Sequence, residues 1–141
     1  MSYLINFHPS GGWFRWFDCG DLQGLWMLVN VVEVCRNTPS ISHWLPTHEP
    51  FVVAAYLDKY GEFPDNLCVR ISADYVEDRP TTPTWGLPTH TVHRWKDEPV
   101  PAADGDRKKS IACMSYKRGN KCDGCRACWS RKVQNVSLPV H

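Results

Sequence analysis

The 141-residue sequence has no apolar run near the roughly 20 residues that a membrane-spanning helix needs, so we expect no such helix. It also lacks a P-loop, a G-x-G-x-x-G fingerprint, a G-x-S-x-G nucleophile motif and an H-E-x-x-H zinc motif. Its first residues have neither the basic start nor the apolar stretch of a secretory signal. These absences predict a cytoplasmic protein without the commonest nucleotide-binding and hydrolase motifs.

Acidic residues are scarce in only one part of the chain. Residues 107–141 contain nine Lys or Arg and one Asp or Glu, which is a net charge of +8. Residues 1–106 contain seven Lys or Arg and fourteen Asp or Glu, which is a net charge of −7. The total net charge of +1 therefore hides a strong asymmetry between the two parts. The sequence predicts an α/β body over residues 1–96, a Pro/Ala/Gly/Asp linker over 97–106 and a basic segment over 107–141.

The body alternates β-prone and helical patterns. The predicted elements, in chain order, are a strand at 13–17, a helix at 22–36, a strand at 41–45, a helix at 51–60, a strand at 66–72 and a fourth strand at 91–95. The first three strand centres lie about 27 residues apart, which is the length of one strand–helix step. We therefore expect three or four βα-type units that form a partial barrel or an open, mostly parallel sheet.

Polar residues follow the predicted strands, at the ends where parallel sheets bind their ligands. The candidate catalytic residues are Asp18, Asp21, Glu49, Arg70 and Asp74. Three of them also have a structural interpretation. Asp21 can cap the helix that follows, Glu49 can favour a helix dipole, and Arg70 can form an ion pair inside its strand.

The cysteine count is seven, and an odd count without an export signal argues against a disulfide framework. Three cysteines lie among apolar residues and are expected to be buried or strand-end thiols: Cys19, Cys35 and Cys68. The other four have the spacing C-x8-C-x2-C-x2-C: Cys113, Cys122, Cys125 and Cys128.

This spacing predicts a metal site in the basic segment. Three cysteines in a C-x2-C-x2-C run with one remote cysteine are typical of a 4Fe–4S cluster. Zinc is the alternative, although it more often binds two separated pairs, and a histidine such as His141 can replace one cysteine. Free structural thiols are the remaining interpretation.

Basic side chains surround these cysteines, and they have two interpretations. They are Lys117, Arg118, Lys121, Arg126 and Arg131. They can offset the negative charge of metal-bound thiolates. They can also contact the phosphates of a nucleic acid, with Tyr116 and Trp129 available for stacking.

Most of the chain, from about residue 12 to 141, resembles the phage gene product 88 domain family. The resemblance rests on residues 14–21, 32–39, 43–49 and 64–73 and on the ending Lys121-Cys122…Cys125-Arg126-Ala127-Cys128-Trp129…His141. It implies a phage or prophage protein with a metal-associated cysteine cluster. Family members carry an additional N-terminal stretch with several cysteines, which this sequence lacks. That stretch is similar to the cluster-binding loop of radical S-adenosylmethionine enzymes, which also use βα barrels.

Two functions follow as hypotheses. The first is a small phage metalloprotein that binds a host protein or a nucleic acid in the host cytoplasm, with a regulatory or anti-host role. The second is an iron–sulfur enzyme related to radical S-adenosylmethionine barrels, with an acidic site at the strand ends. Exposed strand edges also make homo-oligomers an expectation.

Overall fold

The computed structural model describes residues 12–17, 19–80, 83–94, 98–122 and 124–140. Its helices and strands are β1 (Trp13–Arg15), α2 (Leu25–Asn37), β2 (Ser42–Thr47), α3 (Pro50–Tyr60), β3 (Leu67–Ser72), β4 (Thr89–His93), β5 (Ser110–Ala112) and β6 (Asn135–Pro139). Three short 3-10 turns complete it: η1 (Arg107–Lys109), η2 (Ser115–Arg118) and η3 (Ala127–Trp129). The chain divides into two compact units, an N-terminal unit of Met1–Val69 and a C-terminal unit of Arg70–His141.

The strands form one sheet in the order β1-β2-β3-β4-β6-β5. The pairings of β1 with β2, β3 with β4, β4 with β6 and β5 with β6 are all parallel. The predicted α/β class and mostly parallel sheet are therefore confirmed. Two strand–helix units are present in the described residues, β1–α2 and β2–α3, whereas loops and 3-10 turns connect the later strands. No helix of this part of the chain is long and apolar enough to cross a membrane.

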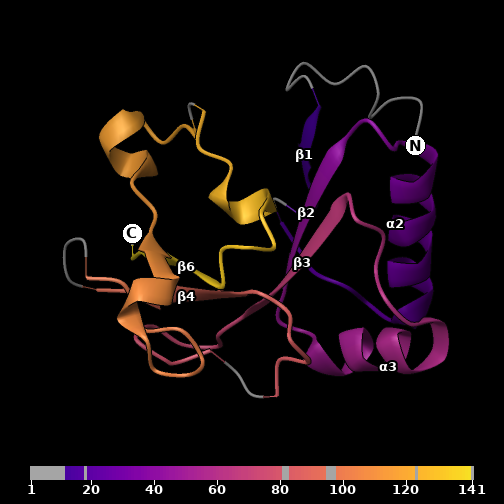
Figure 1. Cartoon of the computed structure of the whole chain (residues 1–141), viewed down its shortest axis with the longest axis horizontal. Helices are drawn as coiled ribbons and strands as arrows, with labels where there is room; N and C mark the ends of the chain where they lie inside the picture. Colours follow the sequence, from indigo (N-terminus) through magenta and orange to yellow (C-terminus); the bar gives the residue numbers. More distant parts are fainter. Residues whose placement is uncertain (1–11, 18, 81–82, 95–97, 123, 141) are drawn as a thin grey trace. The chain divides into compact units, whose positions relative to one another are not determined.

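Apolar packing forms the core of the N-terminal unit. Both helices lie on the same side of β1 and β2 (Figure 1). The helix residues that are buried there are Leu28, Val31, Val32 and Cys35 of α2 and Val53 and Tyr56 of α3. The Tyr56 ring stacks on Phe63 with 4.8 Å between ring centroids. Because full burial of a large apolar side chain contributes about 1.5–3 kcal/mol, these contacts are the main source of stability here.

The start of α2 differs from its prediction. The helix begins at Leu25 after Gly24, so Asp21 is not its N-cap and that prediction is wrong. The Asp21 carboxylate instead accepts hydrogen bonds from the Leu22 N–H (2.7 Å), the Thr47 hydroxyl (2.5 Å) and the His48 N–H (2.7 Å). Three hydrogen bonds to one carboxylate stabilise it more than the single bond of a helix cap would. Asp21 therefore fixes the turn between β2 and α3.

The end of α2 is held by a residue from the start of β3. The Asn66 side-chain amide donates to the carbonyls of Cys35 (2.8 Å), Thr38 (3.1 Å) and Ile41 (3.0 Å). The Cys35 carbonyl lies in the last turn of α2, where a helix leaves acceptors for groups outside it, and the other two lie in the segment that leads to β2. Asn66 therefore joins the end of α2 to the strand that follows α3.

The core of the C-terminal unit is polar, and residues 107–141 contribute to it as part of the sheet. Strand β6 lies between β4 and β5, so the basic segment 107–141 contributes two strands to the sheet. Asn135 of β6 is fully buried, and its amide donates to Thr91 (2.9 Å), Ser110 (2.7 Å) and the Val100 carbonyl (3.2 Å). The Asn135-Val136-Ser137-Leu138 alternation of β6 is typical of a strand with one exposed face, yet Asn135, Val136 and Ser137 are all buried.

Candidate functional site

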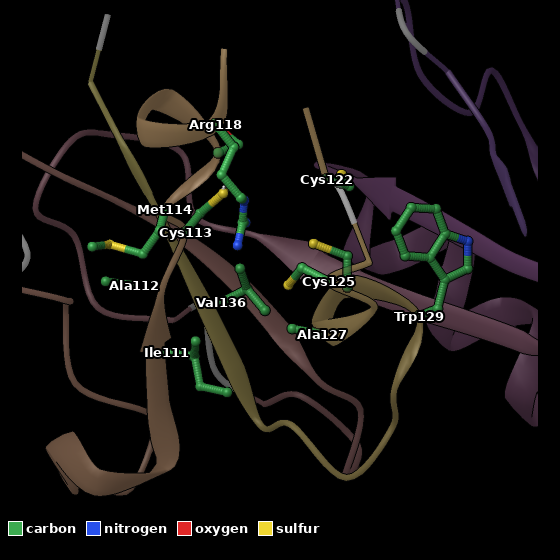
Figure 2. A pocket seen from close by; sticks show the side chains of 12 residues that line it. Ile111, Ala112, Cys113, Met114, Arg118, Cys122, Cys125, Ala127, Trp129 and Val136 are labelled. Atoms are coloured by element: carbon green, nitrogen blue, oxygen red, sulfur yellow. Dashed lines mark hydrogen bonds between the residues drawn. The ribbon is translucent and has the colours of Figure 1, made fainter. Parts of the chain in front are cut away.

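The four clustered cysteines line one hollow of about 190 Å³ in the C-terminal unit (Figure 2). The other residues that line it are Ile111, Ala112, Met114, Ser115, Arg118, Ala127, Trp129 and Val136. Cys113 and Cys128 are partly buried, whereas Cys122 and Cys125 are exposed. Cysteines up to 15 positions apart in the sequence thus share one opening to solvent.

The backbone explains how these thiols come together. Cys113 directly follows β5, and its N–H donates to the Ser137 carbonyl of β6 (2.7 Å). The Cys125 N–H donates to the Cys122 carbonyl (2.8 Å), which closes a turn that has Gly124 at φ +91°. This left-handed conformation favours glycine. Cys128 lies in η3, so two successive turns carry the C-x2-C-x2-C run.

Arg70 anchors the loop that carries Cys128. Its side chain is fully buried, and its guanidinium donates five hydrogen bonds to backbone carbonyls. The acceptors are the carbonyls of Cys128 (2.9 Å), Thr89 (3.1 Å), Ala127 (2.8 Å), Ser130 (2.7 Å) and Val133 (2.9 Å). One cation in β3 therefore fixes η3 and the segment that leads into β6.

The thiols interact electrostatically with one another. Burial raises the pKa of the Cys128 thiol to about 12, the Arg70 charge opposes this rise, and the other three cysteines add to it. Cys128 is therefore a thiol at neutral pH when only protein groups surround it. Among the residues that the structure describes, no three His, Cys, Asp or Glu side chains are placed closely enough to hold a metal ion.

The chemistry of the hollow nevertheless fits a sulfur-ligated metal. Its donor set is four thiols, and thiolates select iron–sulfur clusters and zinc. Among the residues that the structure describes, no carboxylate or histidine lines it. The predicted substitute ligand His141 lies outside the described residues. An iron–sulfur cluster, a zinc ion and free structural thiols are the three predicted states of these cysteines.

The predicted partner-binding residues are found in two kinds of position. Lys117, Lys121 and Arg131 are exposed, and Arg126 is half-buried. The Lys117 ammonium lies 5.7 Å from the Tyr116 ring centroid, and the Arg126 guanidinium lies 5.7 Å from that of Trp129. Arg118 differs from these four residues because it lines the hollow.

The candidate catalytic residues have separate surroundings. Asp18 lies outside the described residues, and Asp74 is exposed. Glu49 is exposed beside the turn that Asp21 fixes, and its side chain does not cap α3. Arg70 contacts the cysteine loop, which the sequence did not predict, although a charge inside a strand was a signal that it needs a partner. No sequence signal indicated that Ser115 would lie 3.4 Å from the Cys113 sulfur.

Comparison with known proteins identifies the family. No curated protein and no solved structure matches the chain. The sequence model of the Gene product 88 family matches residues 3–131, which include all four cysteines of the hollow. The resemblance seen in the sequence is thus confirmed, and the chain belongs to the Gene product 88 family of phage gene products.

Proposed function

We propose that this phage protein binds a metal centre through Cys113, Cys122, Cys125 and Cys128 and acts in the host by contacting a macromolecular partner. A 4Fe–4S cluster is the first choice for the centre, and zinc is the alternative. The observation that carries the proposal is that four cysteines, one after β5 and three from two successive turns, line one hollow.

Two features of the hollow support this assignment. A volume of about 190 Å³ leaves room for a polynuclear cluster as well as for a single ion. Four metal-bound thiolates also leave a net negative centre, and the buried Arg70 supplies positive charge beside Cys128. The thiols must lose their protons when they bind metal, so binding is expected to weaken as pH falls.

The protein residues have distinct roles in this proposal. The metal, when bound, supplies the positive charge that keeps the cysteines as thiolates. Arg70 positions Cys128 through the backbone, and the Cys113 N–H bond to β6 positions the remote ligand. The centre would thus link β5 to the loop that precedes β6.

The basic surface supports a nucleic acid as the partner. The exposed Lys117 and Lys121 and the Arg126–Trp129 pair combine positive charge with aromatic rings. That combination is typical of surfaces that bind single-stranded nucleic acids. The enzyme hypothesis has weaker support, because three hydrogen bonds already engage the Asp21 carboxylate and five engage Arg70.

Metal analysis of anaerobically purified protein tests the metal centre. We expect stoichiometric iron and sulfide with absorbance near 400 nm, or one zinc per chain in a colourless protein. Cys125→Ser should lose most of the metal, whereas Cys19→Ser should retain it, because the exposed Cys19 does not line the hollow. A folded wild-type protein without metal, or equal metal in both variants, would refute the proposal.

Salt-dependent binding to a single-stranded oligonucleotide tests the partner. Because each phosphate contact contributes about 0.7 to the slope of log affinity against log salt, the double variant K117A/K121A should lower that slope by about 1.4. Lys59→Ala is the matched control, since Lys59 is exposed on α3 of the N-terminal unit. Equal slopes for both variants would exclude this nucleic-acid surface and leave a host protein as the partner class.

A further inference from the structure

One cation near the cysteines differs from its basic neighbours. Lys117 and Lys121 are exposed, whereas Arg118 lines the hollow and its Nε atom is buried. Figure 2 shows the Arg118 side chain extending into the hollow on the side of Cys113. Long basic side chains usually carry their charge to solvent, so the inward direction of Arg118 needs a specific cause.

The buried Nε–H of Arg118 identifies the kind of group it faces. It has no hydrogen-bond acceptor among the described residues, and a buried charged donor without an acceptor is unfavourable. The sulfur atoms that line the hollow belong to Met114 and the four cysteines. Thioethers and neutral thiols are weak acceptors, whereas an anionic sulfur accepts a strong charge-assisted hydrogen bond. The complement of this guanidinium is therefore anionic sulfur.

We infer that Arg118 donates its Nε–H to an anionic sulfur of the metal centre, and that it tunes that centre rather than contacting the partner. This inference rests on the proposed metal site. Hydrogen bonds to the sulfurs and nearby positive charge stabilise the more negative, reduced state of an iron–sulfur cluster, which raises its reduction potential. With zinc, the same bond slows release of the metal, because it stabilises a thiolate ligand.

A redox titration of the purified full chain tests this role. Arg118→Gln should shift the one-electron reduction equilibrium about tenfold toward the oxidised state, which corresponds to about 59 mV. Lys117→Gln removes the same charge from the same turn but faces outward, so its potential should stay near that of the wild type. Arg118→Lys should give an intermediate value, since it keeps the charge and loses the Nε–H. Equal potentials for the glutamine variants would overturn the inference.

The metal itself separates this inference from the proposal on which it rests. If wild-type protein contains no metal, the metal proposal fails and the inference fails with it. If the metal is present and Arg118→Gln behaves as Lys117→Gln does, only the inference fails. With zinc as the metal, the measurement is the rate of transfer to a chelator, which should rise about tenfold in Arg118→Gln alone, and equal rates would overturn the inference.

Discussion

The two units of this protein differ in the kind of group they bury. The N-terminal unit carries a net charge of −4, from three basic and seven acidic residues, and packs two helices over an apolar core. The C-terminal unit carries a net charge of +5, from thirteen basic and eight acidic residues, and buries polar side chains on its strands. Those strand residues are Arg70, Thr89, His90, Thr91, His93, Ser110, Asn135 and Ser137.

This difference matters because the two cores fail in different ways. An apolar core loses stability gradually as contacts are removed, whereas a buried polar network is unfavourable as soon as one member lacks its partner. We therefore expect polar substitutions in the C-terminal unit to have larger effects than surface changes of the same size elsewhere. The hollow that the four cysteines line belongs to the C-terminal unit, whose core contains the buried polar network.

The largest effect is expected for Arg70→Met. It removes the guanidinium donor from five carbonyls, of which Ala127 and Ser130 keep a backbone N–H, and it should lower the free energy of unfolding by about 3–5 kcal/mol. Urea denaturation followed by circular dichroism measures this loss. Arg36→Met is the control, because Arg36 is exposed in the last turn of α2. Equal stability of the two variants would show that Arg70 does not hold the C-terminal unit together.

Asn135→Ala should have the next largest effect. It removes the donor to Thr91, Ser110 and Val100 and the acceptor for Thr89, at a cost of about 2–3 kcal/mol. Gln134→Ala is the neighbouring exposed control and should change stability little. Amide hydrogen exchange should show the loss of protection in β4 and β6, with α2 unaffected. An equal loss of protection in α2 would contradict the expectation that Asn135 stabilises the C-terminal unit alone.

The N-terminal unit also buries a histidine, and pH tests its contribution to stability. Burial lowers the pKa of His43 to about 4, and its ring accepts from the Trp16 indole N–H (3.2 Å) and contacts the Thr38 hydroxyl (2.8 Å). The unfolded chain binds the proton at about pH 6.5, so stability should fall as pH drops from 6.5 toward 4, by about 2 kcal/mol.

Chemical denaturation at about pH 7 and about pH 4.5 measures this dependence. His43→Gln should flatten the difference between the two conditions, whereas His48→Gln should leave it unchanged, because His48 is exposed. A wild-type slope that persists in His43→Gln would assign the pH dependence to other groups.

The smallest effect is expected for the surface ion pair of the C-terminal unit. The hydrogen bond from Lys109 lowers the pKa of Asp104, and both side chains are exposed, Asp104 before η1 and Lys109 at its last position. Such pairs contribute little because solvent and salt screen them. Lys109→Ala should therefore leave the melting temperature unchanged in a thermal scan. A clear decrease would mean that surface charge, as well as the buried network, stabilises this unit.

The sequence predicted the N-terminal unit better than the C-terminal one, for a physical reason. Apolar residues recur with helical and strand periods in residues 25–72, and α2, α3 and β3 lie within three residues of their predicted bounds. β5 has only three residues, and β6 offers only Val136 and Leu138 between the polar residues Asn135 and Ser137, so the apolar pattern of both strands is short. The positions of these two strands depend on pairing with residues distant in the sequence, which a local pattern does not reveal.

The site shows the same division. Cysteine spacing was enough to predict a shared location for the four thiols, because three of them lie in one seven-residue run. The directions of long side chains were not predictable. Asp21 binds a turn instead of a helix end, Arg70 reaches the cysteine loop, and Arg118 faces the hollow. Each depends on which donors or acceptors the folded chain brings within reach.

X-ray absorption at the metal edge of anaerobically purified full-length protein tests the central claim most directly. The metal centre in the hollow predicts a first shell made only of sulfur, with metal–sulfur distances of about 2.3 Å for zinc, and a second metal–metal shell if the centre is an iron–sulfur cluster. Loss of this signal in Cys125→Ser and its retention in Cys19→Ser would assign it to the hollow. A first shell of oxygen or nitrogen, or no bound metal in the folded protein, would contradict the account.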